Sequence, residues 1–170
     1  AFNDTVVGIA PGGSVPPYAS QLNPNTVGSE GWAVEWLSWH ENQFIIAECQ
    51  FNLGNTEGAI ETLNNTMSIL EDRWRSFDST CVLPKYSNIS GQDVISAIMN
   101  EKYKALFLNM QTLSDWRRTG YPKFQDRNGA STTCDSGTPR RLLYPEVEKN
   151  TNTNAPDGDS IFERVQNDPF

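Results

Sequence analysis

The sequence predicts a mainly α-helical fold in which helical hairpins are joined by long irregular loops. Two observations lead to this prediction. Apolar residues recur at helical spacing over residues 36–75 and 90–120, and the other stretches are rich in glycine, proline and polar residues. The chain has 170 residues, of which 37% are hydrophobic and 11% aromatic, so it can bury a core of its own. We therefore expect a single domain, residues 1–170.

Residues 1–35 are expected to form an extended loop region. They contain the stretch "APGGSVPPYASQLNPNTVGSEGW", which has turn-forming residues throughout and no sustained period. A loop of this length is uncommon in a compact protein unless it serves binding or belongs to a larger structure.

Residues 36–75 are predicted to form a helical hairpin. The first helix carries apolar residues as far as Phe51 and stops at Gly54, because glycine readily follows a helix end. The second helix begins at once, with Asn55 or Thr56 as its N-cap. So short a joint forces antiparallel packing, and it resembles the joint of a tetratricopeptide repeat (TPR). One such unit cannot bury both faces, so we expect partner helices elsewhere in this chain or in sequence missing from it.

Residues 90–120 are predicted to form one long helix, because apolar residues keep helical spacing for roughly five turns from Ile95 to Leu113. Ser90 and Asp93 have the spacing of a capping box at its start. Arg117 and Arg118 fall in its last turn, where positive charge complements the helix dipole. The arginines therefore have an adequate local explanation as the end of a helix.

Residues 121–170 are expected to be a loop-rich C-terminal segment. It contains a second arginine pair, Arg140 and Arg141, in "TPRRLLYPEVEKN". The dipole of a single helix end does not explain why a second pair follows.

Composition excludes several classes of function. The formal charge of −8 and the pI near 4.6 argue against nucleic-acid binding, which needs a basic face. No stretch approaches the roughly twenty apolar residues of a membrane-spanning helix. The single histidine, His40, and the absence of a CxxC pair leave no plausible ligand set for a metal, and nothing in the sequence indicates a cofactor.

The three cysteines permit two arrangements. Cys49 lies within the apolar helical pattern, where we expect a buried free thiol. Cys81 and Cys134 lie in polar, loop-like sequence, so they could form a disulfide in an oxidising compartment or remain free.

Three ordered motifs resemble the C-terminal region of SusD/RagB-family outer-membrane lipoproteins, in particular the SusD-like subfamily associated with starch binding. They are "HENQFIIAECQFNLGNTEGAIETLN", "EKYKALFLNMQTLSDWRRTGYPKF" and "PRRLLYPEVEKNTNTNA". The resemblance covers roughly residues 38–154. It departs at the end, where the subfamily usually carries a tryptophan pair and this chain reads "IFERVQNDPF".

The resemblance implies a binding protein and not an enzyme. Members of the family are lipid-anchored on the outer face of the outer membrane, where they capture oligosaccharides, or peptides in the RagB branch. They deliver these nutrients to a SusC-like TonB-dependent transporter. Members are longer than this chain and begin with a signal peptide and a lipidated cysteine. We therefore expect this chain to be a C-terminal fragment of an α-superhelical fold, whose lipid anchor is missing from it.

Sugar recognition directs attention to exposed aromatic side chains, which stack on the apolar face of a pyranose ring. Tyr18 and Trp32 are the candidate ligand-binding residues, because they lie in the long loop and join no helical stripe. Trp36 and Trp39 are spaced with Phe44 along a helix, so we expect them in the core or in helix packing.

The motif residues are expected to be structural. Glu146 and Glu148 could suggest the paired carboxylates of a glycosidase, but the neighbouring arginines favour salt bridges. We expect Arg117 or Arg118 to be half-buried and bound to carboxylate or carbonyl groups, with Glu146 and Glu148 as the obvious acids. The expected structural residues are Trp116, Arg117, Arg118, Arg141, Tyr144, Glu146 and Glu148.

Two other classes of function remain open from the sequence. A repeat-type protein-interaction module is opposed by the single hairpin, since no repeat period follows it. A carbohydrate-active enzyme is opposed by the absence of a convincing acid/base pair.

Overall fold

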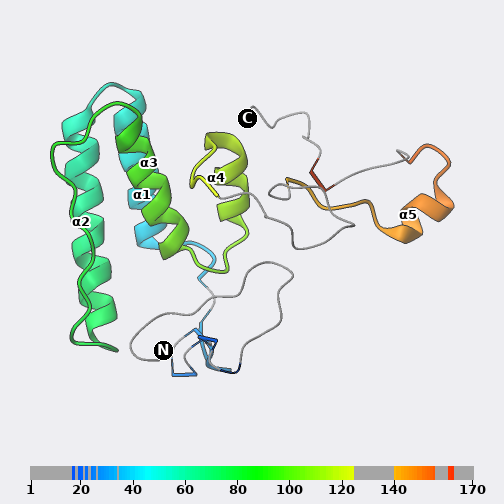
Figure 1. Ribbon diagram of the computed structural model, residues 1–170, viewed down its shortest axis with the longest axis horizontal. Helices are drawn as coiled ribbons and strands as arrows, with labels where there is room; N and C mark the ends of the chain where they lie inside the picture. The colour runs from blue at the N-terminus through cyan, green and yellow to red at the C-terminus, as the bar shows by residue number, and fades with distance from the viewer. Residues whose placement is uncertain are drawn as a thin grey trace. The chain divides into compact units, whose positions relative to one another are not determined.

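The computed structural model describes residues 17, 19–20, 22, 24–25, 27–33, 35–124, 140–155 and 161–162. These residues form five α-helices and no strand, which confirms the mainly α-helical class (Figure 1). The chain divides into two compact units, residues 23–122 and residues 1–22 with 123–170. The first unit contains α1 (Trp39–Asn52), α2 (Thr56–Arg75), α3 (Gln92–Ala105) and α4 (Gln111–Thr119), and the second contains α5 (Glu146–Thr151).

α1 and α2 form the predicted hairpin. Gly54 and Asn55 end α1, and Asn55 also caps the start of α2. Gly54 has a φ of 83°, and its N–H donates to the carbonyl of Phe51 at 2.9 Å. The N–H of Asn55 donates to the carbonyl of Gln50 at 2.9 Å, which completes a Schellman motif. The side chain of Asn55 then accepts the N–H of Gly58 at 3.0 Å and caps α2.

The core of the first unit lies between α1, α2 and α3, which pack side by side (Figure 1). Two alanines, Ala47 on α1 and Ala59 on α2, are fully buried and let the two helices approach closely. Larger apolar residues of all three helices fill the remaining space. The buried cluster comprises Phe44, Ala47, Ala59, Leu63, Met67, Leu70, Val94, Ile95, Ala97, Ile98 and Met99.

Side chains tie the non-helical segment 76–91 to α2 and α3. Asn64 on α2 donates to the carbonyl of Tyr86 at 2.7 Å and accepts its N–H at 2.8 Å. Glu71 accepts the N–H of Leu83 at 2.9 Å, and this bond is the main reason that the pKa of Glu71 is lowered. The hydroxyl of Tyr86 donates to Glu101 on α3 at 2.7 Å, and burial together with this bond raises the pKa of Tyr86. Backbone groups that lack a sheet partner are thus satisfied by side chains.

The prediction of one continuous helix over residues 90–120 was wrong. α3 ends at its C-cap Leu106, and Leu108 has a φ of 67°, which no α-helix accommodates. Asn109 then accepts the N–H of Gln111 at 2.9 Å through its side chain and starts α4. A local asparagine bond of this kind competes with a continuing helix, although the apolar spacing runs across the break.

The predicted capping box at the start of α3 is also absent. The N-cap is Gly91, with a φ of 56°, and it makes no side-chain cap. The N–H of Asp93 bonds instead to the backbone carbonyl of Ser90 at 3.2 Å.

Three residues expected in the core lie at the surface. Ser38 is the N-cap of α1, so Trp36 precedes the helix and is 91% exposed. Trp39 is 50% exposed, and Cys49 carries a free thiol on the exposed side of α1. The buried side of α1 is instead lined by Phe44, Ala47 and two acids.

Candidate functional site

Arg118, the second arginine of the "WRRTGYP" motif, is held by two acids. Its guanidinium donates to both carboxylate oxygens of Glu48 on α1, with Nη2 2.9 Å from Oε2. Nη2 also donates to Asp115 Oδ1, one turn earlier on α4, at 2.9 Å. The planar guanidinium matches a carboxylate with two parallel bonds. The bond to Glu48 is the largest cause of a raised pKa of Arg118, so this side chain stays charged and ties α4 to α1.

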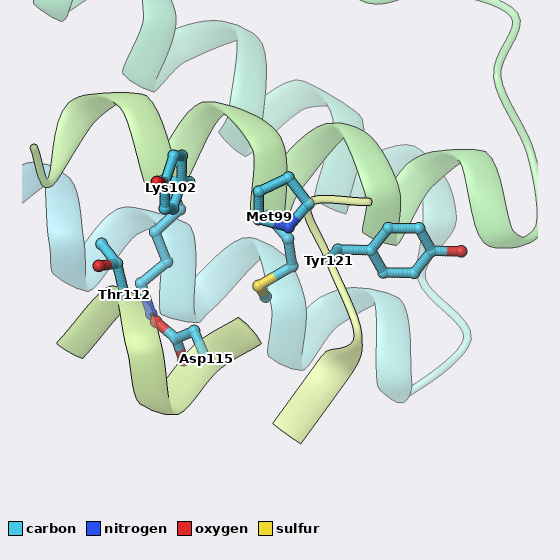
Figure 2. Close-up of a pocket in the computed structure, with 7 residues that line it drawn as sticks. Met99, Lys102, Thr112, Asp115 and Tyr121 are labelled. Carbon is cyan, nitrogen blue, oxygen red and sulfur yellow. Dashed lines mark ion pairs between the residues drawn. The ribbon is translucent and has the colours of Figure 1, made fainter. Parts of the chain in front are cut away.

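Asp115 is shared with a second cation, Lys102 on α3. Lys102 Nζ lies 2.6 Å from Asp115 Oδ2, and the two side chains are 4% and 8% exposed. The contact is an ion pair without hydrogen-bond geometry, since Oδ2 has no hydrogen-bond partner among the described residues. Figure 2 shows Lys102 reaching toward Asp115 from the neighbouring helix. The two cations balance the two acids, which makes burial of the group tolerable.

The hollow beside this pair is too small for a nutrient. Its volume is about 10 Å³, which is the space of one water molecule. Its walls come from α3, α4 and the turn after α4, and the lining residues are Met99, Lys102, Tyr103, Thr112, Asp115, Tyr121 and Pro122. We name the group of Glu48, Lys102, Asp115 and Arg118 the ion cluster. Its ion pairs join α1, α3 and α4, so its role is to hold these helices together.

The sequence identified the chemistry of Arg118 but not its partners. The side chain of Arg118 is 51% exposed and binds carboxylates, as expected. The carboxylates that Arg118 binds are Glu48 and Asp115, which were not predicted. The expected pairing with Glu146 and Glu148 stays a prediction. Trp116, between these charges on α4, is buried, with 7% of its surface exposed.

The two acids of the C-terminal motif lie in the first turn of α5, in the second compact unit. Negative charge there complements the helix dipole. Glu148 Oε1 accepts a bond from Asn152 Nδ2 at 2.6 Å, and both glutamates are exposed. A structural role for Glu146 and Glu148 stays a prediction.

The second arginine pair holds its own segment together. The backbone N–H groups of Arg140 and Arg141 both donate to the carbonyl of Ile161, at 2.7 and 3.1 Å. The guanidinium of Arg141 lies over the ring of Tyr144, 5.2 Å from its centroid, in a cation–π contact.

An aromatic surface in the first unit contains the predicted ligand residue Trp32. The ring of Trp32 packs on Phe77 with centroids 6.2 Å apart, and Phe77 packs on Trp74 at 5.9 Å. Trp32 and Trp74 are half-buried, whereas Phe77 is 51% exposed. These aromatic side chains thus contact one another while part of their surface reaches solvent.

Two charged residues are close in sequence to these aromatic residues, since Glu35 follows Trp32 by three positions and Arg73 precedes Trp74. Glu35 Oε1 accepts a bond from Arg73 Nη2 at 2.8 Å, and both side chains remain exposed, at 40% and 37%. The pair fastens the segment before α1 to the end of α2, next to Trp74. We name the group of Trp32, Glu35, Arg73, Trp74 and Phe77 the tryptophan surface.

His40 is in the first turn of α1 and lies close to Glu35. Its Nε2 is 3.9 Å from Glu35 Oε2, and the residue is 8% exposed. Burial lowers the pKa of His40, and this outweighs the opposing effects of Glu35 and Glu41. Arg73 lowers the pKa further, so His40 is neutral near pH 7.

Several members of the tryptophan surface were not predicted as site residues, although the predicted hairpin indicated where they lie. An antiparallel hairpin brings the start of α1 next to the end of α2, which places Glu35 near Arg73 and Trp74. Trp36, the exposed indole beside Glu35, was missed because its spacing matched a helix that starts only at Trp39.

Two predicted residues, Tyr18 and Cys134, lie outside the described residues. Cys81 carries a free thiol in the structure, and its pairing with Cys134 stays a prediction.

The described residues contain no group of three side chains suited to hold a metal ion. Within the same residues, no helix is both long and apolar enough to cross a membrane.

One known protein family has a model that matches most of the chain. The family model SusD-like_2, described as "Starch-binding associating with outer membrane", matches residues 6–145. Neither a curated protein nor a solved structure matches. The matched range includes the α1–α2 hairpin, the arginine motif at the end of α4 and the second arginine pair. The chain therefore belongs to the SusD-like family of starch-binding proteins associated with the outer membrane.

Proposed function

We propose that this chain captures oligosaccharides at the outer face of the outer membrane and passes them to a SusC-like TonB-dependent transporter. In this proposal the whole protein is held at the membrane by a lipid anchor and performs no chemistry on the sugar. Membership of the SusD-like family supports the proposal. The tryptophan surface is the observation from which we assign oligosaccharide binding to particular residues.

The tryptophan surface combines the two kinds of contact that sugars need. An indole face accepts the apolar C–H face of a pyranose ring, and Trp32 packs against Phe77 with the two rings tilted by 55°. Glu35 and Arg73 are exposed enough to accept from and donate to sugar hydroxyls. Because these two side chains already hold each other, binding costs little further ordering.

Trp36 extends the same segment with a second indole. It is 91% exposed and directly follows Glu35. It lies four positions after Trp32, a span of at most about 14 Å between the two Cα atoms. A chain of several sugar residues can contact both indoles, which favours an oligosaccharide over a single sugar.

Calorimetry with malto-oligosaccharides tests the proposal, because the family description names starch. We expect Trp32→Ala to weaken binding about tenfold, equal to about 1.4 kcal/mol for the loss of one stacking face. Phe107→Ala is the matched control, since Phe107 is also an exposed aromatic residue, 56% exposed, and lies after α3. We expect this control to bind as the wild-type chain does.

The alternatives give different outcomes. Binding of peptides without binding of any glycan would favour the RagB-like function and overturn the proposal. Equal affinity of Trp32→Ala and wild type would remove the tryptophan surface from the binding site. Release of reducing sugar from a polysaccharide would contradict a purely binding role. Co-purification with a TonB-dependent transporter from cell envelopes tests the transfer step.

A further inference from the structure

One carboxylate oxygen of Asp115 lacks the hydrogen bond that its burial requires. Oδ1 accepts a bond from Arg118 Nη2 at 2.9 Å, whereas Oδ2 has no hydrogen-bond partner within the described part of the chain. Lys102 Nζ, 2.6 Å away, balances the charge of Oδ2 without the geometry of a hydrogen bond. Asp115 is only 6% exposed. Buried polar atoms are nearly always hydrogen-bonded, and an ordered water supplies the bond where the protein does not.

The hollow between α3 and α4 has the size of such a water. Its volume of about 10 Å³ is at the lower limit of the space that one water molecule needs, so any larger ligand is excluded. Asp115 and Lys102 both line it, and Thr112 lines it from the first turn of α4. In Figure 2, Lys102 and Met99 extend from the same side of α3.

The polar groups around the hollow complement the donors and acceptors of one water. Asp115 Oδ2 is an acceptor without a donor. The ammonium of Lys102 has three N–H donors, and its ion pair with Asp115 uses none of them with hydrogen-bond geometry. The hydroxyl of Thr112 donates to the carbonyl of Asn109 at 2.7 Å, so its oxygen is left as an acceptor. Two acceptors and one donor thus surround a space of molecular size.

The charges beside the hollow favour a neutral occupant. A metal ion would be repelled by the ammonium of Lys102, which lies at the carboxylate itself. An anion would be repelled by Asp115, whose oxygen is the atom that lacks a donor. A water molecule meets neither objection, and it can donate and accept at once.

We propose that this hollow is a binding site for one resident water molecule. The water donates to Asp115 Oδ2 and to Thr112 Oγ1, and it accepts from Lys102 Nζ. Three hydrogen bonds are the usual number for a buried water. The water extends the ion cluster to the first turn of α4 and gives α3 and α4 a second connection beside the ion pair.

Oxygen-17 magnetic relaxation dispersion tests the proposal, because it counts the long-lived waters of a protein in solution. We expect Thr112→Val to hold one such water fewer than the wild-type chain, since valine keeps the shape of threonine but offers no acceptor. Thr112→Ser is the control, because serine keeps the hydroxyl, and its count should equal that of the wild type. Circular dichroism establishes that each variant keeps its helices.

Nuclear Overhauser effects (NOEs) between water and the methionine methyl groups locate this water. Met99 lines the hollow and is 2% exposed, so its methyl group should show an NOE to a long-lived water. Met67 is equally buried but lies on α2 and does not line the hollow, so it should show none. The effect at Met99 should persist in Thr112→Ser and disappear in Thr112→Val.

Equal numbers of long-lived waters in the wild type and a folded Thr112→Val overturn the proposal. A wild-type chain without an NOE at Met99 also overturns it. The relaxation measurement follows the water oxygen, so exchange of Lys102 protons cannot imitate its result. If Thr112→Val does not fold, a high-resolution crystal structure of the wild type decides: a water oxygen within hydrogen-bond distance of Asp115 Oδ2 supports the site, and its absence overturns it.

Discussion

Replacing Arg118 by methionine tests whether the arginine motif is a structural fastener. Methionine keeps much of the length of the side chain but removes the three hydrogen bonds to Glu48 and Asp115. Asp115 retains Lys102 as its counter-charge. Glu48, whose side chain is only 10% exposed, loses the cation that compensates its burial.

The magnitude follows from the unequal exposure of the partners. Breaking a buried ion pair by removing one member costs about 3–5 kcal/mol, because the other charge stays buried. Arg118 is 51% exposed, so water reaches Glu48 once the arginine is gone and lowers this cost. We expect the free energy of unfolding to fall by about 2–3 kcal/mol, and the melting temperature by roughly 5–10 °C.

The assay is urea denaturation followed by circular dichroism, with Arg117→Met as the matched control. Arg117 is the adjacent arginine on the same helix and makes no ion pair with the described residues, so its replacement should change stability by less than about 0.5 kcal/mol. Adding Glu48→Gln to Arg118→Met should recover about 1 kcal/mol, because the stranded charge is removed. If Arg118→Met is as stable as Arg117→Met, the ion cluster is not a fastener.

Two further predictions concern His40 and Gly54. Because burial lowers the pKa of His40 below its unfolded value of about 6.5, stability is full above that pH and declines as the pH falls below it. His40→Gln should lose less stability than wild type between about pH 7.5 and 5.5 in urea titrations, and equal losses would contradict this cause. Gly54→Ala should cost about 1 kcal/mol in thermal unfolding, because Gly54 has a φ of 83° and its added Cβ meets no atom within 4 Å. Gly31→Ala, at a glycine without positive φ, should cost nothing measurable, and a similar loss there would refute the argument from φ.

Features set by neighbouring residues could be predicted from the sequence. The α1–α2 hairpin depends on apolar spacing and on Gly54 and Asn55, all of which act within a few residues. The end of α4 near Arg118 was equally local, and Gly120 there has a φ of 71°. The break after α3 could have been found from Asn109, but the apolar residues continue across it and favoured one long helix.

Features set by distant pairs could not be predicted in the same way. Glu48 and Arg118 are 70 positions apart, and no local rule chooses Glu48 over the nearer Glu146. One signal was available, since Glu48 is an acid on the apolar side of α1 between Ala47 and Phe51, and a buried acid requires a cation. The tryptophan surface likewise depends on a tertiary contact, between the segment before α1 and the end of α2.

Asn55 has a consequence for the way the molecule opens. Its N–H closes α1 and its side chain caps α2, so neither helix end can fray without releasing a bond of the other. In native-state hydrogen exchange, the two ends at this turn therefore behave as a single opening unit. The hairpin is thereby a rigid base for the segment before α1, which the Glu35–Arg73 pair fastens to the end of α2.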